Sequence, residues 1–262
     1  MTGLSVFHSY AEEFETRLRL KTFPLAVKLL EKEEDIPERA IRPKRDLGHH
    51  IALCVALSMS RREGTILAML KEDMWCFDPV IGLGLAEPPE YFLEGYNRFP
   101  ESARTLEAGK NWACAFPRLE CGKYIGIMSA PLKTANFTTD LIIIYCDSAQ
   151  LTQLLMAANC KDGRDITSRL SGMSACVYAI TPAMQSREYQ VTSPCAGDSR
   201  HAMAQDDEIT FTAPIEKVED LITGLRYLGE HNNALPRILT VELEYQLPEK
   251  YEKIGKMLGM DI

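Results

Sequence analysis

The chain has 262 residues, of which 46% are hydrophobic and 25% are charged, a composition typical of a globular protein with a proper core. Its formal net charge is −8, which argues against general nucleic-acid binding, because that function needs a basic face to displace counterions. The first residues lack a signal-peptide pattern, and the apolar runs are too short to span a bilayer. We therefore expect a cytoplasmic protein with no nucleic-acid or membrane partner, whose eight cysteines are reduced.

Hydrophobic periodicity and turn residues divide the chain into helices and strands. Residues 5–20 carry apolar side chains at helical spacing, and residues 23–30 form an apolar run typical of a buried strand. The other expected elements are, in chain order, a loop at 31–48, a helix at 49–64 ending near Gly64, a strand at 65–71, a loop at 76–85, helices at 89–99 and 101–109, strands at 123–132 and 140–147, a helix at 148–163 with Ser148 as its N-cap, strands at 176–184, 188–193 and 208–214, and helices at 214–232 and 248–259.

This mixture of elements predicts a mixed α/β (α+β) fold with residues 1–262 in a single domain. A weak internal repeat is also visible. In the first half, an apolar strand is followed by a helix with a cysteine, then by Gly64 and Cys76. The second half has the same order, with a strand, a helix with a cysteine, Gly163 and Cys176. The repeat suggests two related αβ halves, residues 1–122 and 123–262, around mixed sheets.

Four cysteines stand at positions that suit a metal or a cluster. On the expected helix, Cys54 follows His50 by four residues, which places both side chains on one face. Cys76, Cys176 and Cys195 lie where loops meet helices or strands, and backbone N–H groups at such junctions stabilise thiolates. Iron–sulfur clusters need thiolate ligands and benefit from N–H donors to sulfur, although none of the compact cluster spacings occurs here.

The remaining cysteines are weaker candidates for ligands, and Cys160 is the fifth in order. Cys146 ends an apolar strand and is expected to be a small buried hydrophobe. Cys114 and Cys121 are too widely spaced for a zinc knuckle, and Cys160 sits at the end of a helix.

Several segments together resemble one family across nearly the whole chain. They are "CFDPVIGLGL", "KYIGIMSAPL" and the run from "SGMSACVYAITPAM" through "VTSPCAGDSRHA" to "DDEITFTAP". The resemblance is to the uncharacterised archaeal and bacterial family called domain of unknown function 169. In that family's pattern a cysteine falls at the positions of Cys54, Cys76, Cys176 and Cys195. The resemblance implies a shared role for these four thiols and supplies no reaction.

The leading hypothesis is a cytoplasmic redox protein with an iron–sulfur cluster, most simply [4Fe–4S], held by those four cysteines. Gly197 would allow close backbone approach, Arg200 would offset the negative charge, and His50 would be a further cofactor-binding residue. A b-type haem is a candidate second cofactor, and zinc accepts the same four ligands. The role would be electron transfer, redox sensing or catalysis as an oxidoreductase, with a redox partner protein or a small-molecule substrate. We also expect a homodimer.

Two other classes of function stay open at this point. In one, the protein is a non-redox module that binds a small metabolite, and its cysteines are packing residues. In the other, it is a thiol enzyme with Cys195 as nucleophile and His201, six residues later, as base.

Overall fold

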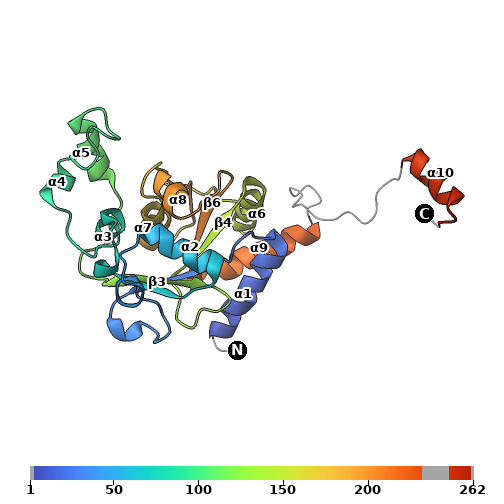
Figure 1. The fold of residues 1–262 in the computed structure, drawn as a ribbon, viewed down its shortest axis with the longest axis horizontal. Helices are drawn as coiled ribbons and strands as arrows, with labels where there is room; N and C mark the ends of the chain where they lie inside the picture. Colours follow the sequence, from blue (N-terminus) through green and yellow to red (C-terminus); the bar gives the residue numbers. More distant parts are fainter. Residues whose placement is uncertain (1–2, 232–247, 261–262) are drawn as a thin grey trace.

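The computed structural model describes residues 3–231 and 248–260. Its centre is a six-stranded sheet in the order β2-β3-β1-β4-β6-β5, and every neighbouring pair of strands is antiparallel (Figure 1). This arrangement confirms the mixed α/β class. The strands are β1 (Leu25–Leu30), β2 (Leu67–Leu70), β3 (Gly126–Pro131), β4 (Leu141–Cys146), β5 (Gln190–Thr192) and β6 (Ile209–Pro214).

Helices cover both faces of the sheet, which makes three layers. On one face, strand residues such as Ala26 and Ile142 pack with α1, α6 and α9, and on the other, residues such as Val27 and Ile143 pack with α2 and α7. Because both faces are buried, the strands are continuous apolar runs in the sequence. The helices are α1 (Gly3–Leu18), α2 (Leu53–Glu63), α3 (Phe77–Gly82), α4 (Glu90–Leu93), α5 (Leu106–Ala115), α6 (Ser148–Asn159), α7 (Ala175–Ser186), α8 (Ala196–His201), α9 (Val218–His231) and α10 (Glu249–Met257).

The strand order has an internal two-fold pattern. Strands β1 and β4 lie side by side at the centre, β3 and β6 flank them, and β2 and β5 form the edges. The matching elements are therefore β1-α2-β2-α3-β3 and β4-α7-β5-α8-β6, and α6, which lies between β4 and α7, is an addition to the second unit. The first unit ends after β3, which differs from the expected boundary between residues 122 and 123. It also pairs α2 with α7, whereas the sequence pattern paired the 49–64 helix with the helix that is α6.

The first unit carries a long insertion between α3 and β3. Helices α4 and α5 belong to it, and Figure 1 shows them extending away from the body of the sheet. This insertion supplies residues to the candidate site described below.

The largest difference from the expected elements is at residues 176–184, which form most of helix α7 and not a strand. Residues 175–183 are all buried, so the segment has no polar face and no amphipathic period to mark it as helical. Its branched residues Val177, Ile180 and Thr181 favour a strand by local propensity, and burial against the sheet overrides that preference.

Smaller differences arise where a backbone group or a side chain makes an unexpected local contact. Helix α2 begins at Leu53, because the Ile51 N–H donates to Asp73 O at 3.0 Å and keeps the preceding residues extended. Gly64 ends this helix as expected, with a φ of 78°. The N-cap of α6 is Asp147 and not Ser148, since its carboxylate accepts from two backbone N–H groups.

Elsewhere, α3 and α8 form within segments that were expected to be loop or turn. The helix expected at 89–99 is reduced to α4, and the helix expected at 101–109 is shifted along the chain to α5. The helix expected at 214–232 corresponds to α9, and residue 232 lies outside the described residues.

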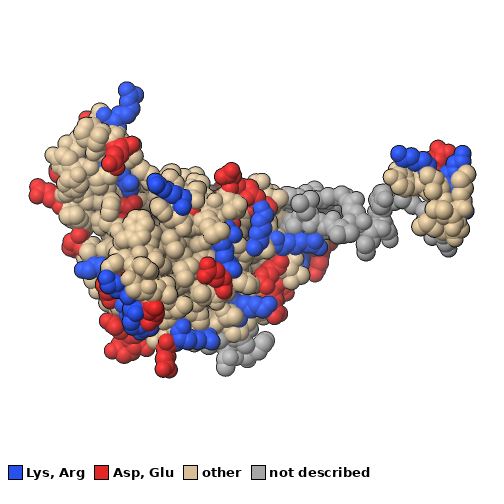
Figure 2. All heavy atoms as spheres, in the orientation of Figure 1, with Lys and Arg blue, Asp and Glu red and all other residues tan. Residues whose placement is uncertain are grey.

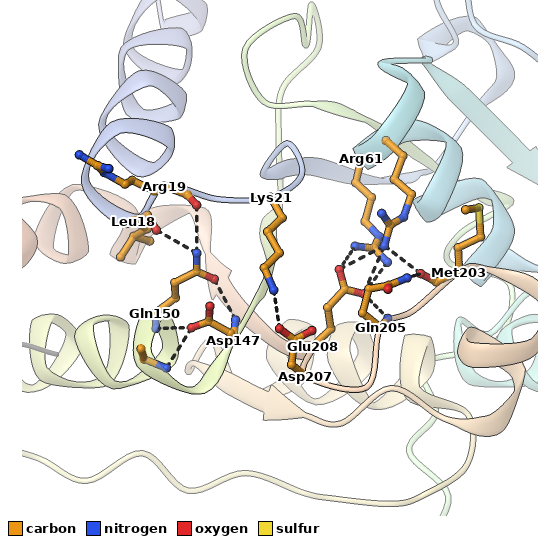
Figure 3. Close-up of polar contacts among 12 residues, drawn as sticks. Leu18, Arg19, Lys21, Arg61, Asp147, Gln150, Met203, Gln205, Asp207 and Glu208 are labelled. Carbon is orange, nitrogen blue, oxygen red and sulfur yellow. Dashed lines mark hydrogen bonds and ion pairs between the residues drawn. The ribbon is translucent and has the colours of Figure 1, made fainter. Parts of the chain in front are cut away.

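Buried polar contacts tie the helices to the rest of the body (Figure 3). Gln150 of α6 donates its side-chain amide to Leu18 O at 2.9 Å, at the end of α1. Arg61 of α2 forms a two-fold hydrogen-bonded ion pair with Glu208, just before β6. On the face that Figure 2 shows, acidic and basic side chains are interspersed over the body.

Candidate functional site

The four cysteines singled out in the sequence lie at the starts of four helices. Cys54 and Cys176 are the second residues of α2 and α7, while Cys76 and Cys195 are the N-cap residues of α3 and α8. The sequence placed Cys176 at the start of a strand, and it lies instead in the first turn of a helix.

These four cysteines line one pocket of about 220 Å³. Each structural unit contributes two of them, one from the helix before its edge strand and one from the helix after it. Chain segments separated by more than a hundred residues are thus brought together. The other lining residues with polar, charged or aromatic side chains are Trp75, Asp78, Arg98, Ser174, Asp198 and His201.

Burial dominates the electrostatics of the four thiols. It raises the pKa of Cys54 to about 12 and that of Cys76 to about 11. The pKa of Cys176 and that of Cys195 are raised for the same reason, with Asp198 as the next contribution. Neighbouring thiols add to the raised pKa of Cys54, Cys76 and Cys176, and because the pKa of each of the four thiols is raised, all four are protonated near neutral pH.

Backbone N–H groups act against this effect at three of the thiols. The donors are Val55 for Cys54, Asp78 for Cys76, and both Ala175 and Asp198 for Cys195, and each lowers the pKa of its thiol. N–H groups in the first turn of a helix generally lack a carbonyl partner within the helix, whereas the Val55 N–H also donates to the N-cap carbonyl of Ala52 at 3.0 Å. They would stabilise thiolate sulfur once a cation has displaced the protons.

Asp198 holds both the side chain and the backbone N–H of Cys195. The Cys195 thiol donates to Asp198 Oδ2 at 2.9 Å, and the Cys195 backbone N–H donates to the same oxygen at 3.0 Å. Through the backbone contact Asp198 also caps the start of α8.

Arg98, which the sequence analysis did not single out, supplies the positive charge inside the pocket. Its guanidinium donates to Asp78 Oδ2 at 2.9 Å and lies over the Trp112 ring at 3.8 Å. No local pattern marks this residue, because it belongs to the insertion and only the tertiary fold brings it to the cysteines.

The three predicted accessory residues have different positions. Gly197 lines the pocket, with Cys195 Sγ 3.4 Å from where its Cβ would lie. Arg200 is exposed on α8 and is not part of the lining. The helical face predicted to join His50 to Cys54 is wrong, since His50 precedes α2, is exposed and contacts Lys44 Nζ at 2.7 Å.

His201 lies at the pocket beside Trp75, with their rings edge to face and 5.6 Å apart. Both side chains are exposed, so they flank the opening of the pocket. The Cys195 thiol donates to Asp198 and has a raised pKa, which are poor conditions for a nucleophile activated by His201.

The pocket does not have the arrangement of a preformed ion site. Among residues 3–231 and 248–260, no group of three or more His, Cys, Asp or Glu side chains is placed to hold a metal ion. The Cys195 side chain is turned toward Asp198 and must move before four sulfurs can share one ligand.

The other four cysteines lie outside the pocket. Cys114, Cys121 and Cys160 are exposed, and Cys146 is buried at the end of β4.

The protein is therefore a three-layered α/β protein with an antiparallel sheet between two layers of helices. Its pocket is lined by four thiols, two from each of the matching units. In the described part of the chain, no helix combines the length and apolarity needed to cross a membrane. Residues 13–224 match the family model DUF169, described as "Uncharacterised ArCR", and the chain belongs to this family. No curated protein matches the chain, and no solved structure does.

Proposed function

We propose that this protein carries an iron–sulfur cluster, most simply [4Fe–4S], ligated by Cys54, Cys76, Cys176 and Cys195, and that it acts as a redox protein. The observation that carries the proposal is the convergence of these four thiols on one pocket. Four cysteine thiolates are the usual ligand set of such a cluster. Three of these four also accept backbone N–H groups, which favour thiolate sulfur.

The chemical environment of the pocket supports this proposal in most respects. When bound, a cluster of this kind supplies one-electron transfer, at a potential set by charge, hydrogen bonds to sulfur and solvent exposure. Arg98 offsets negative charge, and Leu53 and Met173 contribute apolar surface. Loading must release the thiol protons, since burial keeps the thiols neutral.

The contact of Asp198 with the Cys195 thiol opposes cluster binding. A Cys195 thiolate 2.9 Å from the Asp198 carboxylate would be repelled by it. Cys195 must therefore rotate toward the pocket to serve as a ligand, while Asp198 keeps the Cys195 backbone N–H.

One alternative has a specific observation in its favour. A pocket of about 220 Å³ with Trp75 and His201 at its mouth could bind a small metabolite directly, with the thiols as packing groups. The thiol-enzyme alternative is weaker, because the Cys195 thiol is bonded to Asp198.

The test is anaerobic purification of the full chain, followed by iron, sulfide and zinc analysis and an absorption spectrum. We expect iron and sulfide in about equal amounts and a broad band near ~400 nm that dithionite bleaches. Replacing Cys54, Cys76, Cys176 or Cys195 singly by serine should reduce the iron content. Cys114→Ser and Cys160→Ser are matched controls that should keep it, since both thiols are exposed and outside the pocket.

Each other outcome favours a different function. Zinc that is lost in the same four variants would replace the cluster by a zinc site. A colourless, metal-free protein would overturn the proposal and favour the metabolite module. A cytoplasmic location, a homodimer and a b-type haem stay predictions, as does the choice among electron transfer, redox sensing and catalysis.

A further inference from the structure

Ser174, the N-cap residue of α7, has an unusual backbone conformation at the wall of the cysteine pocket. Its φ is 56° and its ψ is 38°, which is the left-handed region that residues other than glycine rarely adopt. The matching N-cap in the first unit, Ala52 before α2, has an ordinary extended conformation with φ −80° and ψ 153°. Such strain persists only where surrounding contacts fix it.

The contacts that hold Ser174 lead directly to Cys76. Ser174 Oγ donates to Asp78 Oδ2 at 2.6 Å, and Arg98 Nη2 donates to the same oxygen at 2.9 Å and to Ser174 Oγ at 3.3 Å. Asp78 lies in the first turn of α3, two residues after Cys76. Ser174, Asp78 and Arg98 together form a polar clamp between α7, α3 and the insertion.

Both clamp donors reach the same carboxylate oxygen. Asp78 Oδ1 is buried without a hydrogen-bond partner in the described part of the chain, so Asp78 depends on Ser174 and Arg98. Removal of the Ser174 hydroxyl leaves the buried carboxylate with Arg98 as its side-chain donor. The position of α3 relative to α7 is therefore sensitive to that one hydroxyl group.

The residues that follow Ser174 lead to two more of the thiols. The backbone N–H of Ala175 donates to Cys195, and Cys176 is the next residue. The left-handed turn at Ser174 sets the direction of this N–H group. Ser174 is thus linked to three of the thiols. It reaches Cys76 through Asp78 and Cys195 through Ala175, and it precedes Cys176 by two residues in the chain.

We propose that Ser174 is a positioning residue: its hydroxyl and its left-handed backbone fix the backbone at Cys76, Cys176 and Cys195, so that these thiols can reach a shared ligand by side-chain rotation alone. This inference rests on the proposed iron–sulfur function and adds a residue outside the ligand set. The two units match in their cysteines and differ at this N-cap, so the clamp makes the two sides of the pocket unequal. The Ala175 N–H to Cys195 would then help to set the reduction potential.

The experiment compares the full-length wild-type chain with Ser174→Ala, Ser174→Gly and the control Ser186→Ala, all purified anaerobically. Ser186 lies at the other end of α7, donates its hydroxyl to Pro182 O at 2.8 Å and accepts from the Glu188 N–H at 3.2 Å, so the control removes a serine hydroxyl from the same helix outside the pocket. Ser174→Gly removes the hydroxyl without a Cβ in the strained conformation, which keeps the test valid where Ser174→Ala folds poorly. Thermal unfolding reports whether each variant is folded.

The readouts are the rate of iron loss to a chelator, the electron paramagnetic resonance spectrum after reduction, and the reduction potential. In both Ser174 variants we expect iron loss about 10-fold faster than in wild type, the effect typical of removing a group that orients a ligand. We also expect a changed spectrum and a shifted potential, which a loss of global stability alone would not produce. Ser186→Ala should match wild type.

Two outcomes would overturn the inference and are distinct. A wild-type protein that binds no cluster removes the proposed function and this role with it. A wild-type cluster whose release rate, spectrum and potential are the same in the Ser174 variants leaves the function standing and removes the positioning role.

Discussion

Arg61 and Glu208 form a buried ion pair in which Nη1 lies 2.6 Å from Oε1 and Nη2 lies 2.9 Å from Oε2. The side chains are 1% and 4% exposed, and the guanidinium also lies over the Tyr145 ring at 3.9 Å. The pair joins α2, which carries Cys54, to the segment between α8 and β6. It therefore ties α2 to the segment that follows α8, and both of these helices contribute residues to the cysteine pocket.

Replacing Arg61 by methionine should strongly lower the free energy of unfolding. The change leaves Glu208 buried without its main partner, which costs about 3–5 kcal/mol. Urea unfolding at neutral pH measures the loss. The matched control is Arg226→Met. Arg226 pairs with Glu13 near the surface, and its side chain is 46% exposed. This substitution should lower the free energy of unfolding by less than about 1 kcal/mol. Equal losses in the two variants would contradict the prediction.

The same pair predicts a pH dependence of stability. Burial raises the pKa of Glu208, but hydrogen bonds from Arg61 and from the Gln205 N–H, with the charges of Arg61 and Arg62, outweigh it, so its pKa is lowered overall. A carboxyl group with a lowered folded pKa stabilises the protein above its unfolded value of about 4.3. That contribution is lost as the pH falls through the folded pKa.

Glu208→Gln should therefore differ most from wild type at neutral pH. The difference in unfolding free energy should shrink as the pH falls below about 4, because the wild-type carboxylate is then protonated as well. Urea titrations of both proteins between neutral and acidic pH give the comparison. A difference that stays constant over this range would show that the charge of Glu208 contributes nothing.

Two glycines of α9 should respond in opposite ways to alanine. A Cβ on Gly224 would lie 2.3 Å from Ala157 O in α6, so Gly224→Ala forces the two helices apart. We expect a loss of about 1–3 kcal/mol in unfolding free energy. On Gly229 the nearest atom is Arg17 Nη1 at 3.3 Å, the end of a flexible side chain. Gly229→Ala should be neutral or stabilise by up to about 1 kcal/mol through helix propensity. Equal thermal shifts in the two variants would argue against the close packing of α6 and α9.

Thiol labelling of the metal-free protein should separate the cysteines into two groups. Cys114 and Cys160 are exposed and should react quickly with iodoacetamide, whereas burial raises the pKa of Cys54 to about 12 and that of Cys76 to about 11 and should slow both. Mass spectrometry of the labelled peptides gives the order. In urea all of the thiols should react at similar rates. Labelling of Cys54 as fast as that of Cys114 in the folded protein would contradict the buried pocket.

Local sequence patterns predicted all six strands of the sheet and the long amphipathic helices, because burial on one or both faces leaves a pattern that can be recognised. They failed at α7, where complete burial removes the amphipathic period and branched residues mimic a strand. They also failed at His50, because the Ile51 contact to Asp73 stops α2 from starting earlier. The four cysteines were identified from their places at turns and junctions and from a family resemblance.

The sequence alone thus determined the fold class and the family, and it singled out Cys54, Cys76, Cys176 and Cys195 as candidate ligands. Only the tertiary structure decided that these thiols meet in one pocket, that two matching units each supply two of them, and that Arg98 supplies the charge expected from Arg200. It also placed the Ser174 hydroxyl on Asp78. The physical reason is that helix starts and apolar runs are properties of neighbouring residues. A contact between segments a hundred residues apart depends instead on how the sheet is ordered and on how its helices pack.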